Sequence, residues 1–251
     1  TVLKADPTIS WSNPTNIIYG TLLNGTQLNA QITGVSTPGA TLPGALAYNP
    51  ASGTLLDAGK HILSVTSDPT NNYNSAFYSV NLAVDKANQT IDWSKFTSPI
   101  IYGTLLTNSA TDGQLNATVA GSSTSGATDP GALSYSRPTN IPVNVGDLLD
   151  AGDYLITVDA AETSNYLPAS ETKSLTVNKA EQTITWARPS AISYGTVLSA
   201  QQLNASVAGS PTTGASDPGA LTYTPATGAL LDAGLRTLSV TAAGTPNYNE
   251  A

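Results

Sequence analysis

Cysteine is absent from the 251 residues, histidine occurs once, and charged side chains make up only 10% of the chain. Without cysteine there is no disulfide, no thiol nucleophile and no thiolate metal site. The single histidine, His61, leaves no histidine-rich metal site and no catalytic triad. The formal net charge of −8 argues against nucleic acid as a partner, because phosphate binding needs clustered Lys and Arg.

Long apolar runs are also absent. No run approaches the roughly 18 residues of a membrane-spanning helix, so we expect no membrane insertion in this segment. No signal peptide is visible, and the sequence has no Met, so we expect it to be a mature or excised piece of a longer protein. A surface built from Thr, Ser, Asn, Gly and Ala, without cysteine, suits an extracellular protein on a bacterial surface.

One motif, Leu-Leu-Asp-Ala-Gly, organises what is present, because it occurs three times, each time followed by an Asn-Tyr pair. Its copies are Leu55–Gly59, Leu148–Gly152 and Leu230–Gly234. Repetition at fixed offsets indicates an array of one module, in which no single copy is a unique active site. Recurrent Val-x-Lys-Ala segments divide the chain into residues 1–4 (the tail of a preceding module), 5–86, 87–179 and 180–251, called repeats 1, 2 and 3 below.

Each repeat contains short runs in which apolar residues alternate with polar ones, which predicts strands buried on one face. The first run of each repeat places Ile two residues before Trp. We expect Trp11, Trp93 and Trp186 to pack in the core, and a sugar-stacking platform is the alternative interpretation. No helical periodicity is visible, so the fold class is all-β. Repeat 2 is longer because of insertions at 107–113 and 137–146, which we expect in surface loops.

About seven short strands and frequent turn signals in each repeat indicate a β-sandwich. The segment Asp150-Ala151-Gly152-Asp153-Tyr154 resembles the corner that precedes the sixth strand of immunoglobulin domains. The resemblance implies that the Asp shapes the turn as an acceptor, that the Gly permits the tight turn, and that the Tyr hydroxyl bonds back to the backbone. Only Tyr154 matches that Tyr, since His61 and Arg236 replace it in the other repeats. The implied structural residues are Asp57, Asp150, Asp232, Gly59, Gly152, Gly234 and Tyr154.

The combined pattern (Ile-x-Trp, Tyr-Gly-Thr-x-Leu, Gln-Leu-Asn-Ala, Asp-Ala-Gly, Asn-Tyr, Val-x-Lys-Ala) is similar to the tandem immunoglobulin-like repeats of large bacterial surface proteins and adhesins. The resemblance implies a structural stalk, spacer or fibre-forming region whose partners are neighbouring modules of the same chain or fibre. The alternatives are a module that binds a cell-surface glycan or protein, and an accessory region of a secreted enzyme. Neither insertion in repeat 2 contains an aromatic residue, so we rank a binding module below a structural spacer.

No group of residues has the types and spacing of a catalytic or ligand-binding site, so no catalytic, cofactor-binding or metal-binding residues are expected. No Asp-x-Asp-x-Asp-Gly calcium loop occurs. A calcium ion that bridges a module boundary through Asp85 or Asp92 is the remaining alternative to solvated surface charges at these positions.

We expect three sandwiches in a row with almost no linker, and therefore an elongated, semi-rigid array. Repeat 3 stops at Ala251, which aligns with Ala76 and Ala169, so it is expected to lack its final strand. Thr1-Val2-Leu3 matches the end of such a strand. The two ends are thus expected to be complementary halves of one module boundary, and a strand supplied to repeat 3 by a neighbouring molecule is the alternative.

Overall fold

The computed structural model describes all residues, 1–251, and its fold is all-β. The chain divides into two compact units, each described below by itself. Unit 1 contains repeat 1 and the four residues before it, together with 87–92, 118–134 and 159–170 of repeat 2. Unit 2 contains the rest of repeat 2 together with repeat 3. The single helical element is a short 3₁₀ turn, and no helix is long and apolar enough to cross a membrane.

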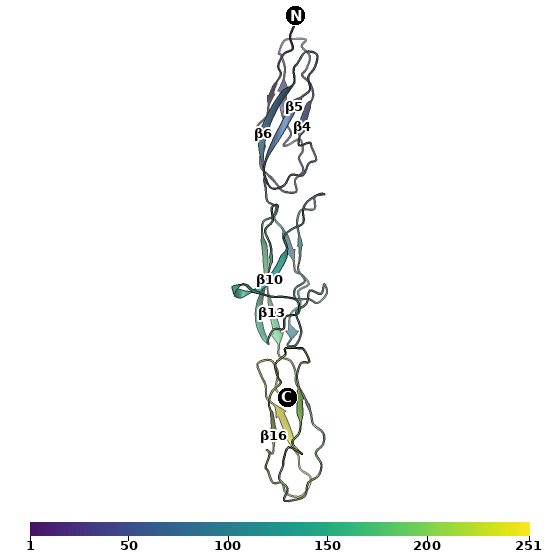
Figure 1. The fold of residues 1–251 in the computed structure, drawn as a ribbon, viewed down its shortest axis with the longest axis vertical. Coiled ribbons are helices and arrows are strands. Elements are labelled where there is room, and N and C mark those ends of the chain that lie inside the picture. The colour runs from purple at the N-terminus through teal and green to yellow at the C-terminus, as the bar shows by residue number, and fades with distance from the viewer. The chain divides into compact units, whose positions relative to one another are not determined.

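The strands are short, apart from two long hairpins (Figure 1). They are β1 (Thr8–Ser10), β2 (Ile17–Ile18), β3 (Gln31–Thr33), β4 (Leu46–Asn49), β5 (Gly59–Ser67), β6 (Ala76–Asp85), β7 (Thr90–Asp92), β8 (Ile100–Ile101), β9 (Thr118–Ala120), β10 (Leu133–Arg137), β11 (Ile141–Pro142), β12 (Gly152–Ala160), β13 (Ala169–Asn178), β14 (Thr183–Thr185), β15 (Ser206–Ala208), β16 (Leu221–Thr224) and β17 (Ser239–Ala242), and the helical turn is η1 (Pro138–Asn140).

Repeat 1 forms two sheets. One has the strand order β2-β6-β5-β4, and the other pairs β1 with β3. Strands β5 and β6 form a long antiparallel hairpin in which Gly59 lies opposite Val84. Strand β2 adds to the edge of β6 in parallel, with Ile17 opposite Val84. The end of β6 is therefore held between β2 and β5, immediately before the chain passes into repeat 2.

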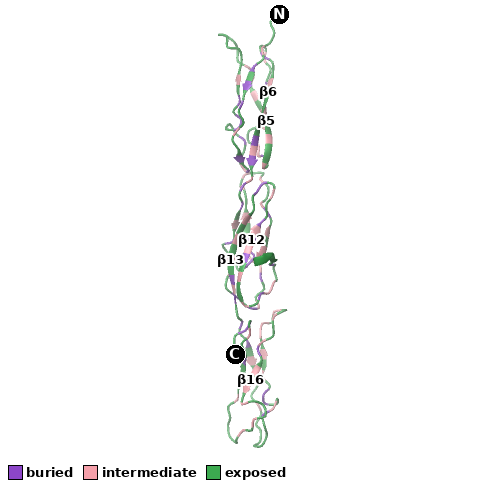
Figure 2. Cartoon of the chain, turned by 90° about the vertical axis from the view of Figure 1, so that its left-hand side faces the viewer, coloured by how far each residue is buried: buried purple, intermediate pink, exposed green.

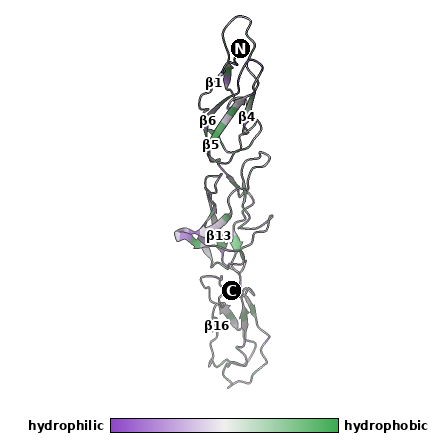
Figure 3. Cartoon of the chain, turned by 45° about the horizontal axis from the view of Figure 1, so that its top comes forward, coloured by the Kyte–Doolittle hydropathy of each residue, from purple (hydrophilic) through white to green (hydrophobic).

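The core of repeat 1 lies between these sheets. Along β5, Leu63 and Val65 are fully buried, while β6 buries Val80, Leu82 and Val84 on one face. Alternation of this kind is the period-2 pattern of a strand with one face toward the core. Figure 2 shows the buried residues distributed along β5 and β6, and Figure 3 shows hydrophobic residues on β5 and β13. The alternating runs in the sequence therefore predict the buried face of this hairpin.

The other repeats reuse the same pairings. The pairing of β1 with β3 recurs as β7 with β9 and as β14 with β15. Strands β8, β13, β12 and β10 follow the order seen in repeat 1, and β11 from the second insertion extends that sheet. In repeat 3, β16 pairs with β17, and no strand corresponds to β6 or β13.

Candidate functional site: contacts between consecutive repeats

The Asp-Ala-Gly corner has the same hydrogen bond in all three repeats, made by three different side chains. Tyr154 Oη donates to the carbonyl oxygen of Asp150 at 3.0 Å. The other two side chains occupy the position of Tyr154 and bond the equivalent Asp carbonyl oxygen. They are His61, whose Nε2 lies 2.7 Å from that oxygen, and Arg236, whose Nε lies 3.0 Å from it. Since a carbonyl oxygen can only accept, His61 carries its proton on Nε2 here.

The glycines of the corner adopt conformations that other residues rarely take. The φ angles of Gly59, Gly152 and Gly234 are 143°, 153° and 119°. A side chain with a Cβ atom is strained at these angles, so glycine is required by the backbone rather than by any contact. The corner is thus a local structure whose turn is made by Gly and whose back-bond needs only a donor of suitable reach.

The Asp carboxylate of the corner makes a contact far along the chain. In unit 1, Asn165 Nδ2 donates to Oδ1 of Asp57 at 2.9 Å, and Asn165 Oδ1 accepts from the backbone N–H of Ala58 at 2.8 Å. Asn165 is 1% exposed, and its Nδ2 also donates to Thr128 Oγ1 at 3.2 Å. The Asn of the Asn-Tyr pair therefore joins the corner of repeat 1 to repeat 2.

Two tyrosines meet edge to face beside this Asn. The rings of Tyr19 and Tyr166 have centroids 5.4 Å apart at an interplanar angle of 85°, a geometry favoured by the ring quadrupoles. The hydroxyl of Tyr19 accepts from the backbone N–H of Thr128 at 2.7 Å, and Tyr166 Oη donates to the carbonyl of Thr128 at 3.2 Å. Both rings are almost fully buried. Thr128 thus connects the two tyrosines, one from each repeat.

The Gly of the Tyr-Gly-Thr turn lets the backbone of repeat 1 come close to repeat 2. Its carbonyl oxygen, on Gly20, accepts from Thr124 Oγ1 at 2.6 Å. A Cβ atom at Gly20 would lie 2.3 Å from Ser122 Oγ and 2.9 Å from Ser122 Cβ. Only glycine leaves room for repeat 2 at this position.

These contacts between repeats 1 and 2, all within unit 1, are named the first junction. The contacts between repeats 2 and 3, all within unit 2, are the second junction, and they use the corresponding atoms. The equivalent contacts are Asn247 Nδ2 to Asp150 Oδ1 (2.9 Å), Ala151 N to Asn247 Oδ1 (2.8 Å), Asn247 Nδ2 to Ser216 Oγ (3.1 Å), Ser216 N to Tyr102 Oη (2.6 Å), Tyr248 Oη to Ser216 O (3.2 Å), Thr212 Oγ1 to Gly103 O (2.6 Å) and the Tyr102–Tyr248 ring pair (5.4 Å).

The connecting segment is held by a buried glutamine. Gln89 Nε2 donates to the carbonyls of Ala161 and Leu167 at 2.9 and 2.7 Å, and its Oε1 accepts from Gly131 N at 2.8 Å. Gln182 makes the corresponding three bonds after the second junction. Each incoming chain is therefore fixed to the repeat that it enters within a few residues of the boundary.

The tryptophans serve the core. Trp11 and Trp93 are buried, and their indole N–H groups donate to the carbonyls of Gln27 and Gln114 at 3.0 and 3.1 Å. Trp186 makes the same bond to Gln202 at 3.0 Å, but it is half-buried. A buried ring is not available for stacking on a sugar, so the first two tryptophans do not form the platform considered from the sequence.

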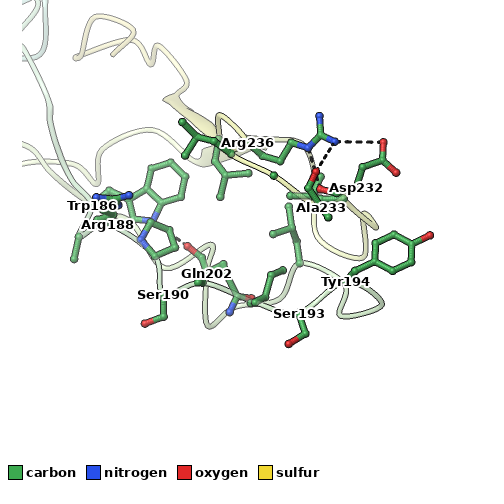
Figure 4. A pocket seen from close by; sticks show the side chains of 18 residues that line it. Trp186, Arg188, Ser190, Ser193, Tyr194, Gln202, Asp232, Ala233 and Arg236 are labelled. Carbon is green, nitrogen blue, oxygen red and sulfur yellow. Dashed lines mark hydrogen bonds and ion pairs between the residues drawn. The ribbon is translucent and has the colours of Figure 1, made fainter.

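Repeat 3 has an open cavity beside Trp186, of about 660 Å³. Figure 4 shows the side chains around it, with Tyr194 directed away from the cavity and Asp232 paired with Arg236. The Asp232–Arg236 ion pair is 3.5 Å long and exposed. Tyr194 is 70% exposed, whereas Tyr19 and Tyr102 at the same position are 3% and 4% exposed. The cavity is lined by Ile192 and Gly234. The equivalent residues of repeat 1, Ile17 and Gly59, both lie opposite Val84 of β6.

The charged groups considered from the sequence do not form a cluster. No group of three or more His, Cys, Asp or Glu side chains is placed to hold a metal ion. Asp85 Oδ2 accepts from Asn16 Nδ2 at 3.3 Å. In repeat 2, the insertion that contains η1 is largely exposed, and Arg137 lies over the ring of Tyr154 at 5.7 Å. Burial, reinforced by the Asp150 carboxylate and opposed by Arg137, raises the pKa of Tyr154.

Sequence reasoning singled out the Asp, Gly and Tyr residues of the corner and the Asn-Tyr pairs, but it missed the other side chains that hold the junctions and the connecting segments. Those side chains are Thr128, Ser216, Thr124, Thr212, Gln89 and Gln182. The available signal was that Thr and Ser recur at one place in each Gly/Ser/Thr-rich excursion. No protein-family model matches the chain, and the search of curated proteins returns no match.

Proposed function

We propose that this chain is a structural spacer, a stalk or fibre-forming region of a secreted bacterial surface protein such as an adhesin, built from tandem immunoglobulin-like modules. The observation that carries the proposal is that both junctions use the same set of atoms. A region whose repeated feature is the contact between neighbours is suited to holding modules in a constant relation. The partners are then neighbouring modules of the same kind.

The chemistry of the junction supports restricted hinge motion. Each junction combines a buried Asn carboxamide, a Tyr hydroxyl that satisfies a backbone N–H, and a glycine that admits the next repeat. Opening the junction exposes these groups and breaks hydrogen bonds worth about 0.5–1.5 kcal/mol each. Several such bonds together make the closed arrangement the dominant one.

Composition supports the location. The chain has no cysteine, few charges, and many Thr, Ser, Asn and Gly residues. The immunoglobulin-like corner is made in each repeat with a different donor, so the turn is kept while the residue changes. Digestion of intact cells of the source bacterium with an added protease tests the location, since a surface protein is cleaved without lysis.

The spacer function is tested by the rigidity of the first junction. Because the chain has no cysteine, Ser79→Cys and Ser170→Cys would carry the only two spin labels, one on each side of this junction within unit 1. We expect a narrow distance distribution by pulsed electron paramagnetic resonance. A distribution as broad as that of a flexible linker would contradict the proposal.

A matched pair of variants sharpens this experiment. Asn165→Ala removes the carboxamide that joins the repeats and should broaden the distribution. Asn72→Ala changes the equivalent residue of repeat 1, whose Nδ2 donates to Thr41 within the same repeat, and should leave the distribution unchanged. Equal effects of the two variants would mean that the Asn–Asp contact does not hold the junction.

A further inference from the structure

Strand β4 is the outermost strand of the larger sheet in repeat 1 (Figure 1). On the side toward β5, the carbonyl oxygen of Ala45 accepts from Asp68 N at 3.1 Å. Because successive residues of an antiparallel strand direct their backbone groups to opposite sides, Leu46 and Tyr48 direct theirs away from β5. No strand pairs with that side of β4. Leu46 and Tyr48 therefore present their N–H and C=O groups at an open sheet edge.

In repeat 2, the insertion covers the same edge. Tyr135 is the equivalent of Tyr48, and its carbonyl oxygen accepts from Val143 N at 3.0 Å. One step further along, Arg137 lies opposite Ile141 of β11. An extended segment thus pairs antiparallel with the outer side of β10. The contact shows which kind of occupant this edge accepts.

The covering segment also blocks further pairing. Val143 directs its N–H toward β10, so Pro142, one residue earlier, faces the opposite side. Proline has no N–H group, and a proline on an outer edge protects that edge against strand addition. Repeat 2 therefore has a covered edge, and the cover ends the sheet.

Strand β4 has neither of these protections. Its residues, Leu46–Asn49, include no proline and no charged side chain. The whole stretch from Pro7 to Leu56 contains no Asp, Glu, Lys, Arg or His. Folded proteins usually protect an exposed edge strand by charge, proline, a bulge or a covering segment. An uncharged, uncovered edge is suited to pairing with another strand.

We propose that β4 pairs with β4 of a second copy of this chain, antiparallel and in register about Ala47. Two identical antiparallel strands are related by a two-fold axis, so the edge is its own complement. With Ala47 on the axis, Leu46 lies opposite Tyr48 of the second copy, and each such pair exchanges N–H···O=C bonds. The net charge of −8 opposes association, but the paired strands bring no charged side chain to the axis. The contact is lateral and uses no residue of the junctions, so it goes beyond the proposed function.

The proposed register makes a measurable prediction at Ala47. Few hydrogen bonds join two untethered molecules here, so the association is weak and depends on concentration. Opposite residues of an antiparallel pair that exchange no hydrogen bonds have Cα atoms about 4.5 Å apart. The two copies of Ala47 form such a pair, and this separation allows a disulfide. Ala47 is exposed, so cysteine can replace it without disturbing the core.

Disulfide trapping tests the proposal. Because the chain has no cysteine, Ala47→Cys carries the only thiol, and the covalent dimer is followed on a non-reducing gel under mild oxidation. Ser134→Cys is the matched control, because Ser134 is exposed and occupies the position of Ala47 in repeat 2, where β11 covers the edge. We expect the Ala47→Cys dimer to form on the order of tenfold faster, since pairing raises the effective concentration of the thiols.

A second control on β4 itself tests the register. Asn49 is also exposed, but in the proposed register it lies opposite Ala45 of the second copy, away from the second Asn49. Asn49→Cys should therefore be trapped as slowly as Ser134→Cys. Trapping of Ala47→Cys no faster than Ser134→Cys would overturn the proposal. Equally fast trapping at Ala47 and Asn49 would overturn it too, because pairing about Ala47 brings only one of these thiols to its counterpart.

Discussion

Asn165 donates from Nδ2 to the Asp57 carboxylate at 2.9 Å, across 108 positions of sequence. Asn247 makes the same bond to Asp150, also at 2.9 Å. A corner motif that reads as a local turn therefore has a second role, because its carboxylate binds the next repeat while its carbonyl oxygen binds the corner's own side chain.

Replacing the glycine of the Tyr-Gly-Thr turn should distinguish backbone strain from crowding at the junction. Gly20 and Gly195 have nearly the same φ, 98° and 99°, but only Gly20 would place a Cβ atom against Ser122. We expect Gly20→Ala to lower the free energy of unfolding by at least about 1 kcal/mol more than Gly195→Ala does. Chemical denaturation of the two variants measures the difference. Equal losses of unfolding free energy would mean that backbone strain, and not crowding against Ser122, accounts for the destabilisation.

Removing the Tyr19 hydroxyl should destabilise the first junction. Tyr19→Phe leaves the N–H of Thr128 without the acceptor that it has at 2.7 Å, and losing this part-buried hydrogen bond costs about 0.5–1.5 kcal/mol. Tyr194→Phe is the matched control, because that ring is 70% exposed, and its effect should stay within about 0.5 kcal/mol. Thermal unfolding that is indifferent to which tyrosine is changed would contradict this contact.

Stability should decline at high pH through the tyrosines of repeat 2. Burial raises the pKa of Tyr135, and burial and Asp150 raise the pKa of Tyr154, above the value of 10.0. The folded state therefore keeps these protons at a pH where the unfolded chain loses them, so the free energy of unfolding falls as pH rises above about 10. Tyr154→Phe should make this fall shallower in denaturation curves collected from pH 8 upward. An unchanged slope would show that Tyr154 does not contribute.

The strands and their buried faces follow from sequence because alternation is a local signal. Leu63 and Val65 lie two apart, and both are fully buried. The corner could be predicted only in part. His61 and Arg236 do not match the Tyr of the immunoglobulin corner, yet each bonds the same carbonyl oxygen, since the turn needs a donor of suitable reach and not a phenol.

The junction could not be derived from sequence because its partners belong to different repeats. Spacing shows that Asp57 and Asn165 recur, but not that the two side chains meet. The resemblance implies that the Asp of the corner accepts hydrogen bonds within its own turn. In repeats 1 and 2 the carboxylate of this Asp accepts a hydrogen bond from the Asn of the next repeat. Only the fold of both repeats brings Thr128 between Tyr19 and Tyr166.

A double-mutant cycle on Asp57 and Asn165 tests most directly the claim that consecutive repeats are joined through these side chains. Asp57→Ala, Asn165→Ala and the double variant are compared with the parent by chemical denaturation. The account predicts a coupling free energy on the order of 1 kcal/mol, as expected for residues in one hydrogen-bond network. Strict additivity of the two substitutions would contradict it.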